Sequence, residues 1–366
     1  MDVGPRIRLA RARAHMSLRD LAGRVGVSAT AISKFERGVT SPRQSTLLAL
    51  ARSLSVGTEF FFREVQVETL QAAYRKHSTL GSHTQRSIEA SIKEVVERHL
   101  IAEEYGPAVA ECDLTQVDVG SLDEAEDAAA LLREQWHLGT GPIEDLCGQL
   151  ENAGVKVIPL DAGSTFDGYA CWVNGSVPVI AFSSERAGDR QRFDLAHELG
   201  HLRMQVHRID AEAAASRFAA AFLIPAAAAK AELGVRRSRL SFEELRLLKA
   251  RYGVSMQAWI RRAFDLGIID REAYTSLFRQ MSSWGWRKDE PGEVRPEQPT
   301  RLFMVVHQAL AEGRIAPSEA ARLLQDAAPR AAQWPTASDL MRAAAHMASI
   351  YAGSPDLVEF SGDELD

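Results

Sequence analysis

The pentapeptide His197-Glu198-Leu199-Gly200-His201 constrains the fold of this chain more than any other feature. On a helix, residues four apart lie on one face, so the two imidazoles can converge on a single cation. Glu198 can then reach a water molecule at that cation and accept its proton. The pattern therefore predicts a helix that carries a zinc site, with Glu198 as the general base; the alternative is a buried helix whose histidines are only hydrogen-bonded.

A zinc site of this kind needs a third protein ligand, and the chain offers three candidates downstream. His207 has the spacing of the metzincins, but Met204 stands where those enzymes have a glycine that turns the chain. Glu212 opens a helical segment whose small residues would pack close to the first helix across Gly200. Asp210 is the remaining acid. We favour Glu212 as the third ligand.

The N-terminal part of the chain is basic although the whole chain is acidic. Residues 1–63 contain 11 Lys or Arg and four Asp or Glu, a net charge of +7, whereas the full chain carries −6. This asymmetry predicts that a polyanion meets the N-terminal part alone.

The same region has the pattern of two short helices joined by a glycine turn. Residues 17–22 indicate a capped helix, Gly26-Val27-Ser28 a turn with a new cap, and residues 29–37 a second helix ended by Gly38. Ser41-Pro42 indicates the start of a further helix. Together these segments predict a helix-turn-helix, although a small helical interaction module with a solvated basic face is the alternative.

In a helix-turn-helix, the second helix enters the major groove of double-stranded DNA. Its exposed side chains would meet base edges, and flanking arginines would contact phosphates. The predicted DNA-binding residues are Ala29, Thr30, Ser33, Lys34 and Arg43.

These N-terminal motifs resemble those of a known family. Residues 5–62 are similar to the DNA-binding domains of lambda-repressor-like, XRE-type regulators. The resemblance is carried by Leu21-Ala22, Gly26-Val27-Ser28, residues 32–38 and Pro42. Leu18 stands where many such domains have a glutamine that contacts DNA, so the resemblance does not imply an operator sequence.

The region around the pentapeptide has a resemblance of its own. Residues from about 150 to 265 resemble the ImmA/IrrE metallopeptidase family. The matching pieces are residues 193–201, the pattern Glu212-x-x-Ala215-x-x-Phe218-Ala219, and Pro225. The resemblance implies a Zn²⁺ ion held by His197, His201 and Glu212, with Glu198 as general base. Asp194 stands where many members carry Thr or Ser, which removes no ligand.

A small sheet is expected before the zinc helix. Residues 155–158, 168–173 and 177–182 read as strands, the last two joined by Asn174-Gly175. An exposed edge of such a sheet can hold an extended peptide by backbone hydrogen bonds. Tyr169 could stabilise an oxyanion there, but a packed strand tyrosine is the interpretation that we favour.

The chain as a whole is predicted to have a mostly helical α+β fold. We expect an all-α helix-turn-helix domain at 1–63, a helical linker with a possible dimerisation role at 64–105, a zincin-like ImmA/IrrE metallopeptidase domain with a small sheet at 106–265, and a helical C-terminal region with an acidic tail at 266–366. Within the last region, residues 289–299 read as a Pro- and Glu-rich linker.

Composition favours a soluble cytoplasmic protein that has no membrane partner. No apolar run approaches 18 residues, and the start of the chain lacks the apolar segment of a signal peptide. The three cysteines are odd in number and far apart, which favours reduced thiols over a disulfide framework.

These observations predict a DNA-binding transcriptional regulator that carries a zinc-dependent endopeptidase. The ImmA/IrrE resemblance implies a protein substrate such as a helix-turn-helix repressor or an antitoxin, in a stress or mobile-element response. A two-fold DNA operator would be read by a homodimer. The alternative is a non-catalytic regulator whose peptidase-like domain senses a metal, peptide or metabolite and modulates DNA binding. A sensor needs no general base, so Glu198 favours the enzyme.

Overall fold

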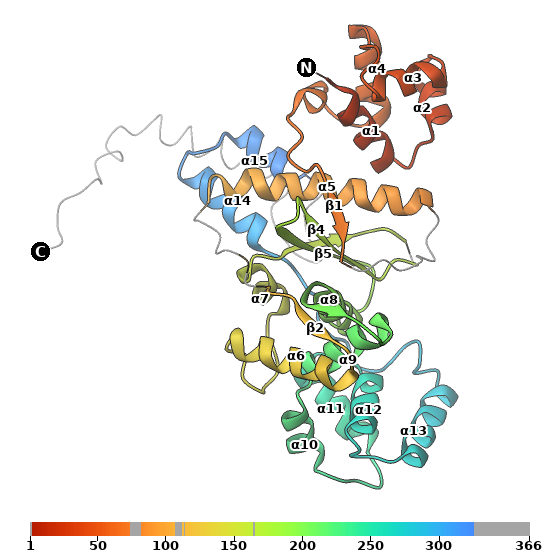
Figure 1. Ribbon diagram of the computed structural model, residues 1–366, viewed down its shortest axis with the longest axis vertical. Coiled ribbons are helices and arrows are strands. Elements are labelled where there is room, and N and C mark those ends of the chain that lie inside the picture. The colour runs from red at the N-terminus through yellow and green to blue at the C-terminus, as the bar shows by residue number, and fades with distance from the viewer. Residues whose placement is uncertain (1, 74–81, 107–111, 113, 164, 326–366) are drawn as a thin grey trace, which may run out of the picture. The chain divides into compact units, whose positions relative to one another are not determined.

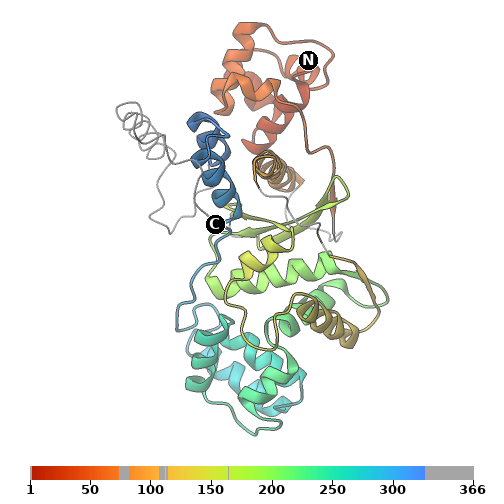
Figure 2. The same cartoon turned by 90° about the vertical axis from the view of Figure 1, so that its left-hand side faces the viewer.

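The computed structural model describes residues 2–73, 82–106, 112, 114–163 and 165–325 (Figures 1 and 2). It divides into two compact units, Met1–Val96 with Ala110–Pro299 and Glu97–Val109 with Thr300–Asp366. The described part is mostly helical with small sheets, so the predicted fold class is confirmed. The expected acidic tail lies outside the described residues.

The N-terminal helices form a small body with its own hydrophobic core. Its elements are α1 (Gly4–Arg13), α2 (Leu18–Val25), α3 (Ala29–Glu36), α4 (Gln44–Leu54) and the 3-10 helix η1 (Thr58–Phe62). Ser17 caps α2 and Ser28 caps α3, as their positions predicted. Gly26 ends α2 with φ 76°, a conformation that favours glycine. Ile7, Leu21 and further apolar residues from all four α-helices form the core.

One predicted helix start in this body is wrong. The further helix, α4, begins at Gln44 with Arg43 as its N-cap, whereas Ser41-Pro42 suggested an earlier start. No side chain caps the amide groups of this first turn. The Arg43 side chain is exposed.

The segment that follows is partly a strand. Helix α5 (Ser82–Glu103) agrees with the predicted helical linker, but β1 (Leu70–Ala72) is extended and pairs antiparallel with β4 (Gly168–Val173). The apolar spacing in this segment suggested a helix. Pairing with a strand about 100 residues away overrides that local preference.

The main sheet has the strand order β1-β4-β5-β3. Strands β3 (Lys156–Leu160), β4 and β5 (Val177–Ser183) confirm the three predicted strands. β5 is antiparallel to β4 and parallel to β3. Asn174 and Gly175 join β4 to β5 with φ of 50° and 78°, as expected for a two-residue turn with both residues left-handed.

Helices cover both faces of this sheet. The part of α5 before residue 97 lies on one face and α8 (Gly188–Arg203) on the other (Figures 1 and 2). A second sheet pairs β2 (Val117–Val119) in parallel with β6 (Met204–Val206), which directly follows α8. The remaining helices of the first unit are α6 (Leu122–Gln135), α7 (Leu146–Asn152), α9 (Ala211–Leu223), α10 (Ala226–Leu233), α11 (Phe242–Tyr252), α12 (Met256–Asp265) and α13 (Arg271–Ser283).

The second unit contains α14 (Arg301–Ala311) and α15 (Pro317–Leu323). Their apolar residues form a separate core with Ala102. The predicted domain boundaries stay predictions. Across the described ranges, no helix combines the length and the hydropathy needed to span a bilayer.

The stretch at residues 289–299 is not helical, as predicted for a linker, but it is anchored along its length. The Glu290 carboxylate accepts hydrogen bonds from the Met256 and Gln257 amides at 2.8 and 3.0 Å. Glu297 pairs with Arg192 of α8 at 2.5 Å, and both side chains are 7% exposed. The stretch therefore belongs to the packed body that supports α8.

Candidate metal centre

Helix α8 brings the two motif histidines together. Their Nε2 atoms lie 3.1 Å apart. In a tetrahedral zinc site with Zn–N bonds of about 2.05 Å, two ligand nitrogens are about 3.3 Å apart. The imidazole pair of His197 and His201 therefore has the spacing that a shared cation requires.

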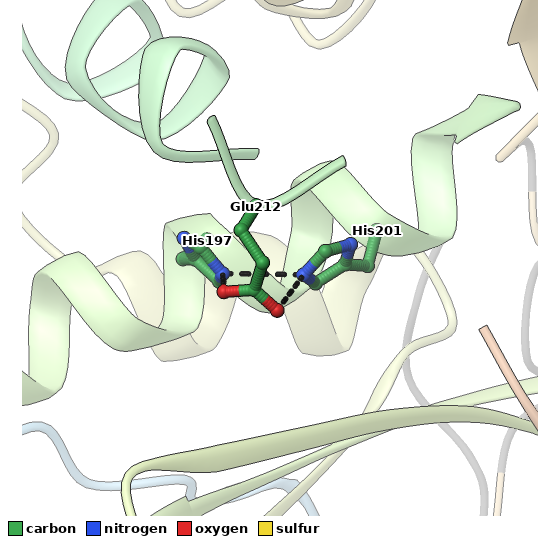
Figure 3. A group of neighbouring side chains, drawn as sticks. All are labelled: His197, His201 and Glu212. Carbon is green, nitrogen blue, oxygen red and sulfur yellow. Dashed lines mark hydrogen bonds and ion pairs between the residues drawn. The ribbon is translucent and has the colours of Figure 1, made fainter. Parts of the chain in front are cut away.

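Glu212 reaches the same point from α9 (Figure 3). Its Oε2 lies 3.5 Å from His197 Nε2, and its Oε1 lies 3.8 Å from His201 Nε2. The three side chains can place one donor atom each within 4.8 Å of the others, and no other such His/Cys/Asp/Glu group occurs in the described residues. Two imidazoles and a carboxylate are a donor set that zinc prefers, so the site fits the metal.

The packing of α9 on α8 sets the position of Glu212. A Cβ atom at Gly200 would lie 3.1 Å from Phe218 Cδ1 and 3.3 Å from Ala215 Cα. The close approach of the two helices across Gly200 is therefore confirmed. Asp210 accepts a hydrogen bond from the Ala213 amide at 2.8 Å and caps α9, which places Glu212 in the first turn.

A partly buried ion network joins α9 to two other helices. Glu126 of α6 pairs with Arg217 of α9 at 2.9 Å and with Arg262 of α12 at 2.6 Å. Burial alone would raise the pKa of Glu126, but hydrogen bonds and charge from the two arginines outweigh it, and the pKa is lowered. Arg262 also donates to the Ile224 carbonyl at 2.9 Å, just beyond the end of α9. The network therefore ties three helices together behind the site.

Glu198 lies between α8 and the first residues of β4. A Cβ atom at Gly168 would lie 2.7 Å from Glu198 Cγ, so only glycine leaves room for this carboxylate. The Ala170 amide donates a hydrogen bond to it. Burial first, and then the carboxylates of Glu212 and Asp194, raise the pKa of Glu198 to about 7, against the opposing effect of His197. A group with this pKa can both accept and release a proton near neutral pH.

Two further side chains, Ser216 and Asp194, interact with His197. Ser216 Oγ of α9 lies 3.4 Å from His197 Nδ1, the nitrogen on the far side of that ring from the site. Burial raises the pKa of Asp194 to about 6, although Arg190, at 3.0 Å, favours its charged form. Tyr169 on β4 has a pKa raised by burial, so it remains a neutral phenol at physiological pH.

The other ligand candidates lie apart from this group. His207 Nε2 pairs with Asp118 Oδ1 at 3.0 Å, and its side chain is 59% exposed. Asp210 is occupied in capping α9. Glu212 is therefore the candidate that the structure brings to His197 and His201.

Four of the five predicted DNA-binding residues lie on α3, and the fifth, Arg43, is the N-cap of α4. Thr30 and Lys34 are exposed on this helix, and Arg43 is exposed at the start of α4. Ala29 and Ser33 are half-buried, and Ala29 packs against the core of the N-terminal body. Thr30, Lys34 and Arg43 thus offer the more accessible side chains.

Sequence reasoning did not find the contacts that Gly168 and Ala170 make with Glu198. These residues are 28 to 30 positions from Glu198 in the sequence, and they come close to it only because α8 packs against the sheet. The one signal in the sequence was a glycine at the start of a predicted strand, which can mark a close approach of backbone to another group.

Two segments of the chain match known families. Residues 7–61 match the family described as Helix-turn-helix. Residues 150–264 match the family described as IrrE N-terminal-like domain, a peptidase family. The chain joins an XRE-type helix-turn-helix domain to an ImmA/IrrE-family domain. His197, Glu198, His201 and Glu212 all fall within this IrrE-like domain.

One curated relative supports the helix-turn-helix assignment. The chain is 33% identical over 81 residues to Repressor protein C2 of Salmonella phage P22. The match covers 22% of this chain and 38% of the repressor, so the chain spans well under half of that relative. No solved structure gives a significant match to the chain.

Proposed function

We propose that the chain is a transcriptional regulator whose IrrE-like domain is a zinc-dependent endopeptidase. The observation that supports the enzyme most strongly is the convergence of His197, His201 and Glu212, with Glu198 held beside them at β4. A site that only sensed a metal would have no use for a proton acceptor held beside the metal ligands by the Ala170 amide.

The reaction is peptide hydrolysis. A bound zinc ion supplies Lewis acidity, which lowers the pKa of water and polarises the scissile carbonyl. Glu198 Oε accepts the proton of the attacking water and passes it to the leaving amine nitrogen. The Ala170 amide and the glycine at 168 hold the Glu198 carboxylate in place for both transfers. Ser216 orients the ring of His197 through Nδ1.

The helix-turn-helix domain binds a double-stranded DNA operator in this proposal. Helix α3 enters the major groove, where Thr30 and Lys34 face base edges, and Arg43 contacts a phosphate at the start of α4. The net charge of +7 on residues 1–63 supports this assignment. A two-fold operator requires two copies of the domain, so we propose a homodimer. The protein substrate is a repressor or an antitoxin-type partner.

The test compares the natural chain with Glu198→Gln. Glutamine keeps the size of the side chain and an acceptor oxygen for the Ala170 amide, but it cannot take the proton. We expect both proteins to bind one zinc ion per chain, measured by elemental analysis. Cleavage of candidate repressors by the variant should fall by a factor on the order of 10²–10⁴, the usual contribution of a general base.

A matched control is Glu134→Gln, an exposed carboxylate on α6 that should leave zinc content and cleavage unchanged. Natural cleavage by the Glu198 variant would contradict the assigned base. If the zinc-loaded natural chain cuts no repressor, while a small ligand changes its DNA affinity, the non-catalytic sensor is the correct function.

A further inference from the structure

The strand β1 lies on the edge of β4, next to the candidate catalytic base. It pairs antiparallel, with Ala72 opposite Cys171 and Leu70 opposite Val173. The pairing extends one residue further, where the Ala73 amide donates to the Ala170 carbonyl at 3.0 Å. The β1 strand therefore runs along β4 toward the residue that contacts Glu198.

Ala170 connects this pairing to the site. In a regular antiparallel ladder, residues 73 and 170 would exchange two hydrogen bonds as a directly opposed pair. Here the Ala170 carbonyl accepts from Ala73, and the Ala170 amide donates to Glu198. The backbone of one β4 residue, Ala170, thus contacts both the chain's own β1 segment and the proposed base.

Backbone hydrogen bonds to β4, the side chain of the turn residue Asn174 and the side chain of Lys93 on α5 hold this segment in place. The Asn174 amide donates to the Thr69 carbonyl at 3.1 Å. The Asn174 side chain accepts from the amides of Glu68 and Thr69 at 3.0 and 3.3 Å, and donates to the Gln66 carbonyl at 2.7 Å. Gln71 at the centre of β1 is exposed. Such contacts depend on the backbone and not on particular side chains, so another extended peptide could make them.

We propose that the β4 edge is the surface that receives an extended peptide substrate, and that β1 occupies this surface in the resting chain. The effect on catalysis rests on the proposed peptidase function. The occupation of the β4 edge by β1 can be tested separately, by measuring peptide binding. The substrate would be an extended polypeptide segment, antiparallel to β4, which must displace β1 before its backbone reaches Glu198. The chain is therefore held inactive by its own interdomain segment.

The binding test uses the full chain without zinc and a fluorescent peptide that has the sequence of residues 66–73. Gln71→Pro removes the amide of a residue paired with Trp172 and weakens β1. We expect this variant to bind the peptide at least about tenfold more tightly than the natural chain, by fluorescence anisotropy, because its β4 edge is free. Gln71→Ala keeps the amide, and its exposed position makes it the matched control, with natural affinity expected. Equal affinity of all three proteins would overturn the proposal.

A second variant keeps the inference testable if Gln71→Pro misfolds. Asn174→Gly tolerates the φ of 50° at this turn and removes the three side-chain hydrogen bonds that hold residues 66–69. We expect it also to bind the peptide more tightly than the natural chain. Unchanged DNA affinity and circular dichroism show that either variant is folded. A folded Asn174→Gly with natural peptide affinity counts against the proposal.

Cleavage by the zinc-loaded proteins separates this inference from the proposed function. If both hold, Gln71→Pro cleaves an unstructured substrate such as casein faster than the natural chain and the Gln71→Ala control. Tighter peptide binding without cleavage by any protein supports the occupied edge and rejects the peptidase. Equal peptide binding and equal cleavage rates reject the occupied edge and leave the peptidase standing.

Discussion

At the scale of single residues, the site depends on a glycine that carries no chemistry. Gly168 faces Glu198 where β4 begins, and the distances from its ideal Cβ position leave no room for a methyl group. The metal-binding pattern could be predicted from the sequence because its residues are close together on one helix. The residues that contact Glu198 could not be predicted, because they belong to a strand whose packing against α8 depends on the fold of the whole domain.

The change Gly168→Ala tests this contact. The new methyl group would lie 2.7 Å from Glu198 Cγ and 2.8 Å from Glu198 Oε1 and would move the carboxylate. We expect kcat/KM for a cleaved repressor to fall on the order of 100-fold, since a displacement of about 1 Å in a catalytic group has that effect. Zinc content should stay at the natural value because no ligand is touched.

The control for this substitution is Gly141→Ala, which adds a methyl group where nothing lies within 4 Å. It should leave both measurements unchanged. A natural cleavage rate in Gly168→Ala would mean that Glu198 tolerates the shift, and that it does not need its position beside β4.

At the scale of elements, helices α2, α3, α8 and α9 and the three long strands followed from sequence periodicity, caps and turn residues. Asn174-Gly175 predicted a tight turn, and both residues have the left-handed conformation that the turn requires. Apart from the start of α4, the exceptions have one cause. β1 and the stretch at 289–299 take their structure from distant partners, β4 for the former and α8 and α12 for the latter. Local patterns contain no information on such partners.

The ion network between α6, α9 and α12 gives a prediction on stability. Glu126→Gln leaves the fully buried Arg262 without its charged partner. We expect the free energy of unfolding at pH 7 to fall by about 3 kcal/mol, as is usual when one member of a buried ion pair is removed. Urea unfolding followed by tryptophan fluorescence measures this difference. Glu134→Gln, an exposed change on the same helix, should stay within about 0.5 kcal/mol.

The pH dependence of this difference has a definite sign. The pKa of Glu126 is lowered in the folded chain from its ordinary value of 4.5. Its ionised form therefore stabilises the fold fully above pH 4.5, and this contribution is lost as the pH falls through the lower folded value. The difference in the free energy of unfolding between the natural chain and Glu126→Gln should therefore become smaller as the pH falls. A constant difference from pH 7 to pH 3 would contradict the ion network.

At the scale of the whole molecule, the DNA-binding and IrrE-like domains have separate hydrophobic cores. One core draws only on residues 3–61, and the other contains residues of α8, α9 and the sheet. The two sequence resemblances could be assigned independently because each domain buries its own apolar residues. The pairing of β1, in the segment between them, with β4 could not be predicted from either resemblance.

Removal of zinc should therefore affect the two domains differently. A metal that binds only the folded state stabilises it, by about 4 kcal/mol at a free concentration 1,000 times its Kd. All six tryptophans lie outside residues 1–63, so their fluorescence reports on the rest of the chain. Chelation should lower the unfolding midpoint seen by tryptophan fluorescence and leave operator affinity at 25 °C unchanged.

The control is the variant Glu212→Ala, which lacks one proposed ligand. Its unfolding midpoint should be low before chelation and should not change when the chelator is added. A midpoint of the natural chain that is insensitive to chelation would contradict a structural coupling between the metal and the IrrE-like domain.

The buried guanidinium of Arg6 fixes one end of the segment that connects the two domains. It donates to the carbonyls of Arg63 and Glu64, which fixes the exit of the chain from the DNA-binding domain. The next fixed point is Gln66, whose carbonyl accepts a hydrogen bond from the Asn174 side chain. Two residue steps reach about 7 Å when fully stretched. Any rearrangement on an operator that moves these two points further apart would separate β1 from β4, so DNA binding would uncover the strand edge beside the proposed base.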